Sequence, residues 1–119
     1  MSAEFGRVIT AMITPMTSSG EVDLAQTGEL AKALVASGTE TIVSTGTTGE
    51  APTLSDDEQF AVWRATKDAV GADVAVIAGA TDNNTAASIA RARVATEMGL
   101  DGVLLTVPAY NKPTQAGLI

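Results

Sequence analysis

The sequence predicts an α/β fold, in which a parallel sheet is covered by the helices that join its strands. Four short apolar runs start about 30 residues apart, which is the spacing of a repeated β-α-β unit. They are apolar at nearly every position, as expected for strands buried on both faces of a parallel sheet. Three segments with helical periodicity lie between them, so the predicted order is β-α-β-α-β-α-β.

The four predicted strands consist mainly of β-branched and aliphatic residues. They are Val8–Ile13, Thr41–Thr45, Val74–Gly79 and Gly102–Val107. Each run is bounded by glycine, proline or polar residues, which is typical of a short strand that turns into a connecting helix. These boundaries place the polar segments after each strand at one edge of the predicted sheet.

The first helix is predicted between Asp23 and Gly38. Asp23 is a candidate N-cap, because its side chain can accept a hydrogen bond from the first turn, and Gln26 stands three residues later. Gly38 occupies the position at which a glycine often ends a helix. The residues expected to face the sheet form an apolar stripe at helical spacing, Leu30, Ala31, Leu34 and Val35.

The second helix is predicted between Ser55 and Gly71 and has the clearest start signal. Ser55 and Glu58 have the spacing of a capping box, in which each side chain accepts a hydrogen bond from the other residue's backbone. The two aspartates between them favour the positive end of the helix dipole. Gly71 follows the last apolar residue and is expected to end the helix.

The third helix is predicted from about Asn84 to Met98 and is ended by Gly99. The segment 83–85 matches an N-glycosylation sequence, but an asparagine that caps this helix is the favoured interpretation. Small and apolar residues recur every four positions and are expected to face the sheet. They are Ala86, Ala90, Val94 and Met98, with Ile89 beside them.

Two architectures agree with this order of elements, an open doubly wound sheet and the first half of a (β/α)8 barrel. Periodicity does not separate them. The first strand is followed by "TPMTSSG" and not by a glycine-rich fingerprint, which disfavours a dinucleotide-binding sheet. The 119 residues accommodate one domain, and we find no linker-like or low-complexity tract.

Composition argues against several functions. The net charge of −7 predicts no basic surface for nucleic acid or for an anionic membrane. The chain contains no cysteine and no histidine, and we expect neither a metal nor a cofactor. The N-terminus lacks the basic start and apolar run of a signal peptide, and no apolar stretch reaches membrane-spanning length. A cytoplasmic protein is therefore expected.

The segment Gly46-Thr47-Thr48-Gly49-Glu50 is the strongest candidate for a binding loop. It follows a predicted strand, at the edge of the sheet where α/β proteins bind ligands. It offers hydroxyls, backbone N–H groups and two glycines that would let the backbone approach a ligand. Because it contains no lysine, it suits a carboxylate better than a polyphosphate. The alternative is a tight turn built from small residues.

Other candidate groups are less specific. Tyr110, the only tyrosine, could relay protons or simply lie at the rim of the sheet. Lysines are the usual nucleophiles for carbonyl chemistry through a Schiff base. Two of the three lysines fall on the polar sides of predicted helices and one falls in a loop, so we expect all three to be solvated: Lys32, Lys67 and Lys112.

A resemblance to a known family rests on two stretches, "VITAMITPMTSSGEVDLAQTGELAKALVASGTETIVSTGTTGEAPTLSDDEQ" and "LLTVPAYNKPTQAGL". They closely resemble the dihydrodipicolinate synthase (4-hydroxy-tetrahydrodipicolinate synthase) family, within the superfamily of pyruvate-dependent aldolases and N-acetylneuraminate lyases. The sister lyases usually carry serine at Thr47, so the threonine favours the synthase. The resemblance implies that residues 1–119 form the truncated N-terminal half of a single TIM-barrel domain, β1-α1-β2-α2-β3-α3-β4.

The resemblance also implies roles for three residues. The hydroxyl and backbone N–H of Thr48 would hold the carboxylate of pyruvate. The hydroxyl of Thr47 would belong to a proton relay, and Tyr110 would be lent across a tight dimer interface to the relay of the neighbouring subunit. Members of the family are usually homotetramers. Lysine-inhibited relatives carry a glutamate where this chain has Ala87, so weakened lysine inhibition is expected, which strong inhibition by millimolar lysine would contradict.

The implied reaction condenses pyruvate, held as a lysine Schiff base, with L-aspartate 4-semialdehyde in the diaminopimelate and lysine biosynthesis pathway. In the family the Schiff-base lysine lies on the sixth strand, which has no counterpart among these 119 residues. The chain alone is therefore expected to be inactive. Two alternatives stay open: a related class I pyruvate aldolase with another acceptor, and a non-catalytic half-barrel module.

Overall fold

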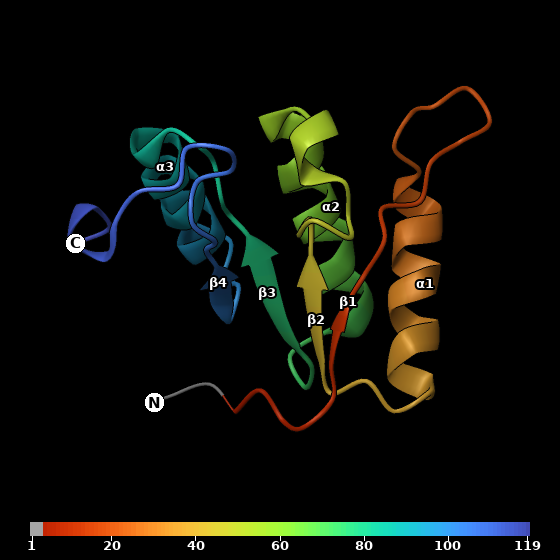
Figure 1. Cartoon of the computed structure of the whole chain (residues 1–119). Helices are drawn as coiled ribbons and strands as arrows, with labels where there is room; N and C mark the ends of the chain where they lie inside the picture. Colours follow the sequence, from red (N-terminus) through yellow and green to blue (C-terminus); the bar gives the residue numbers. More distant parts are fainter. Residues whose placement is uncertain (1–3) are drawn as a thin grey trace.

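The computed structural model describes residues 4–119, so the first three residues of the predicted domain lie outside the described part. In this range four parallel strands alternate with three α-helices (Figure 1). The elements are β1 (Ile9–Ala11), α1 (Leu24–Ala36), β2 (Thr41–Ser44), α2 (Asp56–Val70), β3 (Ala75–Gly79), α3 (Thr85–Glu97) and β4 (Gly102–Leu104), with short 3-10 helices at η1 (Ala51–Thr53) and η2 (Gln115–Gly117). No helix among residues 4–119 has the length and apolar character needed to cross a membrane.

The strand order decides between the two predicted architectures. The strands lie in the order β1-β2-β3-β4, and every neighbouring pair is parallel. Successive right-handed crossovers in one direction place all the helices on one face of the sheet, whereas a doubly wound sheet reverses its direction and carries helices on both faces. The helices of this chain lie together on one face (Figure 1). The described residues therefore form the first half of a (β/α)8 barrel, as predicted.

The apolar core lies between the sheet and this helix layer. One cluster joins the β1–β2 side of the sheet to α1, and a second joins β3 to α2 and α3. The buried members of the first cluster are Met12, Ala31 and Ile42, and those of the second are Trp63, Ala78 and Ala95. The predicted stripe on α1 is confirmed, because its other members pack around Ala31.

The expectation that all four strands are buried on both faces is correct for β2 and wrong for the two edge strands. All four residues of β2 are buried. Ile9 in β1 and Leu104 in β4 are about half exposed. The physical reason is position, since an edge strand in this part of the chain has a neighbour on one side only.

The predicted starts and ends of the first two helices are confirmed. The Asp23 side chain accepts a hydrogen bond from the Gln26 N–H at 2.9 Å. Ser55 and Glu58 form the complete capping box at the start of α2. Gly71 follows α2 with a positive φ of 72°, a conformation that costs a glycine little.

The third helix begins and ends near the predicted residues, and Asn84 is its N-cap. Its predicted inward face is wrong over the first two turns, because Ala86 and Ile89 point to solvent. The inward face instead passes through Ser88 and Arg91 to the buried Ala95. These two polar side chains are accommodated because they bond to the loop that precedes the helix.

A partly buried ion pair ties α2 to the amino-terminal end of the sheet. Lys67 Nζ lies 2.8 Å from Asp101 Oδ2, and the same oxygen accepts a hydrogen bond from the Val76 N–H at 2.8 Å. Lys67 is thus not the solvated residue that its sequence position suggested. Burial raises the pKa of Asp101, but the hydrogen bonds from Lys67 and Val76 and the Lys67 charge outweigh it, so the pKa lies below its usual value.

We expect Asp101→Asn to lower the free energy of unfolding at neutral pH by roughly 1.5–3 kcal/mol, because Lys67 loses a charge-assisted partner. A carboxylate whose pKa is lowered by folding stabilises the protein above its unfolded pKa, and this contribution is lost as pH falls through the folded pKa. The difference in unfolding free energy between wild type and variant should therefore decrease below pH 3.8, the ordinary pKa of this group. Urea unfolding on both sides of that pH measures it.

Glu29→Gln is the matched control, because it breaks an ion pair of similar length, 3.0 Å to Lys32, between two exposed side chains. Exposed pairs of this kind contribute about 0.2–1 kcal/mol. If the two variants lost equal amounts of unfolding free energy, the partly buried Lys67–Asp101 pair would stabilise the protein no more than an exposed pair does.

Candidate functional site

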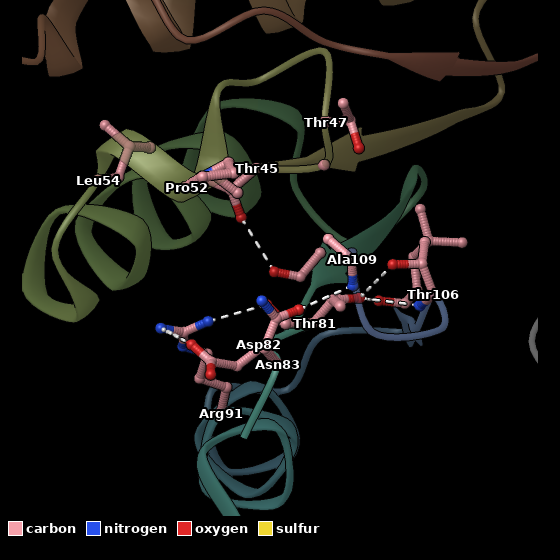
Figure 2. A pocket seen from close by; sticks show the side chains of 14 residues that line it. Thr45, Thr47, Pro52, Leu54, Thr81, Asp82, Asn83, Arg91, Thr106 and Ala109 are labelled. Carbon is pink, nitrogen blue, oxygen red and sulfur yellow. Dashed lines mark hydrogen bonds and ion pairs between the residues drawn. The ribbon is translucent and has the colours of Figure 1, made fainter. Parts of the chain in front are cut away.

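A cavity of about 280 Å³ lies at the carboxyl ends of β2, β3 and β4 (Figure 2). One wall is formed by the β2–α2 loop, with Thr45, Thr47 and Pro52. The opposite wall is formed by the β3–α3 loop and by the segment after β4, with Thr81, Asn83, Thr106 and Ala109 among the lining residues. The site therefore lies at the edge of the sheet where the sequence predicted it.

Thr45 starts the first wall in an unusual conformation. It is buried and has a φ of 52°, which is a strained value for a β-branched residue. The buried indole of Trp63 donates a hydrogen bond from Nε1 to Thr45 Oγ1 at 2.6 Å. This bond fixes the turn from outside the sheet, so the loop that follows leaves β2 in one defined direction.

Two glycines allow the backbone to close around this turn. A Cβ atom on Gly79 would lie 2.2 Å from the Thr45 carbonyl oxygen, and one on Gly49 would lie 3.0 Å from Thr45 Cα. The Gly49 carbonyl also accepts a 2.7 Å hydrogen bond from Thr14 Oγ1. Gly49 is buried, and its small size lets the loop pass close to Thr45 and Met12.

The structure places the three predicted site residues differently. Thr47 lines the cavity and is exposed to it, across from Thr106 and Ala109 (Figure 2). Thr48 is exposed on the same loop but does not line the cavity. Tyr110 is completely exposed, with a relative accessibility of 100%, and also lies outside the lining. The chain therefore brings only Thr47 to the cavity.

A charge network centred on the largely buried side chain of Arg91, which sequence analysis missed, supports the second wall. The side chain of Arg91 is only 13% exposed. Its Nη2 atom lies 2.7 Å from Asp56 Oδ1 at the start of α2 and 3.1 Å from Asp82 Oδ2 in the β3–α3 loop. Its Nη1 atom donates to the Thr81 carbonyl at 2.9 Å. No local pattern pointed to Arg91, because the predicted inward face of α3 did not include it.

The groups available for chemistry are neutral. The cavity presents hydroxyls and backbone N–H groups, while the charged groups of its lining, Arg91 and Asp82, are paired with each other. Lys32 pairs with Glu29 on the surface, and Lys112 is exposed. Among residues 4–119, no cluster of three His, Cys, Asp or Glu side chains could hold a metal ion. This arrangement can bind and orient a small polar ligand.

A parallel sheet in sequential order, with helices on one face and a cavity at the carboxyl ends of its strands, defines the chain as part of a (β/α)8-barrel protein of the enzyme type. A sequence model of the Dihydrodipicolinate synthetase family matches residues 4–119. The chain belongs to that family.

Curated relatives match along almost the whole chain. The 4-hydroxy-tetrahydrodipicolinate synthase of Symbiobacterium thermophilum is 55% identical over 114 residues, which are 96% of this chain and 39% of the relative. The synthase of Cutibacterium acnes is 52% identical over 116 residues, which are 97% of this chain and 40% of the relative. The chain thus spans about two fifths of the length of these relatives.

Solved structures agree with this assignment. The dihydrodipicolinate synthase DapA-2 of Bacillus anthracis superposes with a TM-score of 0.93 at 47% identity, over 97% of this chain and 39% of that one. The chloride-inhibited enzyme of Acinetobacter baumannii, crystallised with pyruvate, also gives a TM-score of 0.93, at 38% identity, over 97% of this chain and 40% of that one. Both matches confirm the fold and the family.

We expect Gly79→Ala to destabilise the protein by about 3 kcal/mol or more, at or above the upper end of the usual range for overpacking. Its Cβ would lie 2.2 Å from a backbone oxygen, and the strained turn at Thr45 cannot retreat without losing the bond from Trp63. The change in unfolding free energy in urea measures the effect.

Gly46→Ala, directly after the Thr45 turn, is the control. Its Cβ would meet the nearest atom, Val43 Cγ1, at 3.6 Å, which is ordinary contact, and its φ is not positive. This variant should retain stability within about 1 kcal/mol. If Gly79→Ala were equally stable, the close approach of β3 to the Thr45 turn would not constrain the fold.

Proposed function

We propose that this chain forms the pyruvate-binding N-terminal half, residues 1–119, of a 4-hydroxy-tetrahydrodipicolinate synthase. Such an enzyme condenses pyruvate with L-aspartate 4-semialdehyde in the cytoplasm, in the pathway to diaminopimelate and lysine. The observation that carries the proposal is the Thr47-Thr48 pair, exposed on a rigidly held loop beside the cavity, in a chain of this family. The pyruvate bound by the Acinetobacter baumannii relative supports the choice of first substrate.

Thr48 is the proposed ligand of the pyruvate carboxylate. Thr48 is exposed on the loop that the Thr45 turn and Gly49 hold in place, and it offers a hydroxyl and a backbone N–H as donors. A hydrogen bond to a charged group is stronger than one between neutral groups, so two uncharged donors suffice to orient an acid. The Thr48 side chain is available for this role because the strained conformation belongs to Thr45 and the buried contacts of the loop are made by Thr45 and Gly49.

Thr47 and Tyr110 are the proposed members of the proton relay. The Thr47 hydroxyl lies at the cavity, whereas Tyr110 is fully exposed and has no cavity contact in its own chain. This exposure agrees with a tyrosine that serves the relay of a second subunit in a tight dimer, within a homotetramer. A hydroxyl pair of this kind moves a proton without a charged intermediate between substrate and solvent.

The Schiff-base lysine is proposed to come from a part of the barrel that these residues do not include. Lys32 and Lys67 are held in ion pairs away from the cavity, and Lys112 is exposed, so none has the desolvated setting that a lysine nucleophile needs. By this proposal the chain alone does not catalyse. A class I aldolase with another aldehyde acceptor is the second candidate, because the described residues do not select the acceptor.

A chimera tests the proposal directly. Residues 4–119 replace the matching segment of the Symbiobacterium thermophilum synthase, with which they are 55% identical. The chimera is expected to condense pyruvate with aspartate semialdehyde. Borohydride reduction in the presence of pyruvate should trap one adduct on a lysine of the relative's portion, located by mass spectrometry.

Two outcomes would contradict the proposal. A pyruvate adduct on Lys32, Lys67 or Lys112, in the chimera or in the 119-residue chain alone, would place the nucleophile in this chain. A folded chimera that neither traps pyruvate nor condenses it would leave the chain as a non-catalytic half-barrel module.

We expect Thr48→Val in the chimera to raise the pyruvate KM and lower kcat. The substitution keeps the shape of the side chain and removes a hydroxyl that faces a carboxylate. Such a hydrogen bond contributes about 1.5–3 kcal/mol, so kcat/KM should fall roughly tenfold to a hundredfold. Steady-state kinetics measure this change, and Thr96→Val, at an exposed position in α3 whose hydroxyl bonds only within that helix, is the control. Unchanged kinetics for Thr48→Val would mean that the residue only builds the turn.

A further inference from the structure

Tyr110 lies at the centre of a strained turn. The Asn111 N–H donates to the Ala109 carbonyl at 2.7 Å, which closes a three-residue turn around Tyr110. The φ of Tyr110 is 67°, which is rare for a residue with a bulky side chain and typical of the strained form of the γ-turn. Such a conformation persists only where the surroundings hold the backbone in place.

Two side chains of the β3–α3 loop hold this segment. Asn83 Oδ1 accepts a hydrogen bond from the Ala109 N–H at 2.8 Å, directly before Tyr110. Thr81 Oγ1 accepts one from the Thr106 N–H at 2.9 Å. Because Tyr110 itself is fully exposed, its own side chain contributes nothing to holding the turn in this chain. Figure 2 shows both bonds, which join the β3–α3 loop to the segment after β4.

The β3–α3 loop is itself braced. Arg91 bonds to the Thr81 carbonyl and to the Asp82 carboxylate, as described above. Ser88 Oγ accepts a hydrogen bond from the Asp82 N–H at 2.8 Å. Three successive residues of the loop are therefore connected to the first turns of α3 or to the Tyr110 segment. Because these bonds hold the loop in place, the side-chain carboxamide of Asn83 has a fixed position beside the Tyr110 segment.

Asn83 has no competing structural duty in the helix. The N-cap of α3 is the next residue, Asn84, whose Oδ1 accepts from the Ala86 N–H at 3.0 Å. The two adjacent asparagines thus have separate partners: Asn84 caps its own helix, and Asn83 reaches a backbone group 26 residues away. This division provides a matched pair of substitutions.

We propose that Asn83 is a positioning residue for Tyr110: its carboxamide holds the Ala109 N–H and thereby the strained turn that presents the phenol. The consequence for catalysis rests on the relay role proposed above for Tyr110. The geometric part does not, because it concerns only the backbone of residues 106–111.

The experiment uses the chimera with Asn83→Ala, Asn83→Asp and Asn84→Ala. Hydrogen–deuterium exchange of the segment 105–112 reports the geometry without any need for activity. In Asn83→Ala, exchange of this segment is expected to rise roughly tenfold, the loss expected for one hydrogen bond. Asn83→Asp keeps the acceptor oxygen and should restore protection. Asn84→Ala removes the helix cap and should change exchange at the start of α3 only.

Kinetics test the catalytic consequence. Asn83→Ala is expected to lower kcat roughly tenfold to a hundredfold, as for a misplaced catalytic group, with the pyruvate KM within about twofold. Asn83→Asp should recover most of this loss, whereas Asn84→Ala should keep kcat close to that of the parent chimera. The split between kcat and KM separates a misplaced relay from general destabilisation.

Each outcome decides the matter. Unchanged exchange at 105–112 in Asn83→Ala would overturn the positioning role, and raised exchange with unchanged kcat would overturn its catalytic consequence. An equal loss of kcat in Asn84→Ala would assign the effect to the helix and not to the Tyr110 turn. If the parent chimera is folded but inactive, the proposed function fails, while the exchange result still supports or overturns the geometric proposal.

Discussion

The hydrogen bond from the Trp63 indole to the Thr45 hydroxyl is the interaction on which the site depends. It joins α2 to the end of β2 across 18 residues, and both partners are buried. It holds a β-branched residue at a φ of 52°, a conformation that costs about 1–3 kcal/mol wherever it occurs. Removing the donor would leave a buried hydroxyl without its main partner, with a further cost of about 1–3 kcal/mol.

The consequences of this turn extend to the neighbouring strand. The Thr45 carbonyl oxygen lies where a side chain of residue 79 would begin, so β3 can lie beside β2 only if residue 79 is a glycine. The other side of the turn receives Gly49, whose carbonyl is bonded by Thr14 after β1. Thr45 and Gly49 together thereby connect the carboxyl ends of three strands. The exposed side chains of Thr47 and Thr48 follow directly after this joint, so the loop that carries them starts from a fixed position.

The second helix connects the two ends of the sheet. Asp56, in its first turn, pairs with Arg91 and reaches the loop beside the cavity. Lys67, in its last turn, pairs with Asp101 at the amino-terminal end of the sheet. Trp63 lies between them in the apolar layer. The helix α2 thus connects the charge network beside the cavity to the ion pair at the opposite end of the sheet. These directional contacts fix the position of α2 along the strands, which apolar packing alone would not do.

The sequence by itself determined the features that depend on residues close together in the chain. Strand runs, the caps at Asp23, Ser55 and Asn84 and the order of elements were all predicted, because each follows from patterns among residues close together in the chain. The motif resemblance added the family. Only the tertiary structure decided the sequential strand order, the inward face of α3 and the burial of Lys67. It also revealed that Gly79 must be a glycine, and that Thr45, Arg91 and Asn83 support the site. The bonds of these residues span between 9 and 35 positions, and no local pattern of charge or hydrophobicity records such a partner.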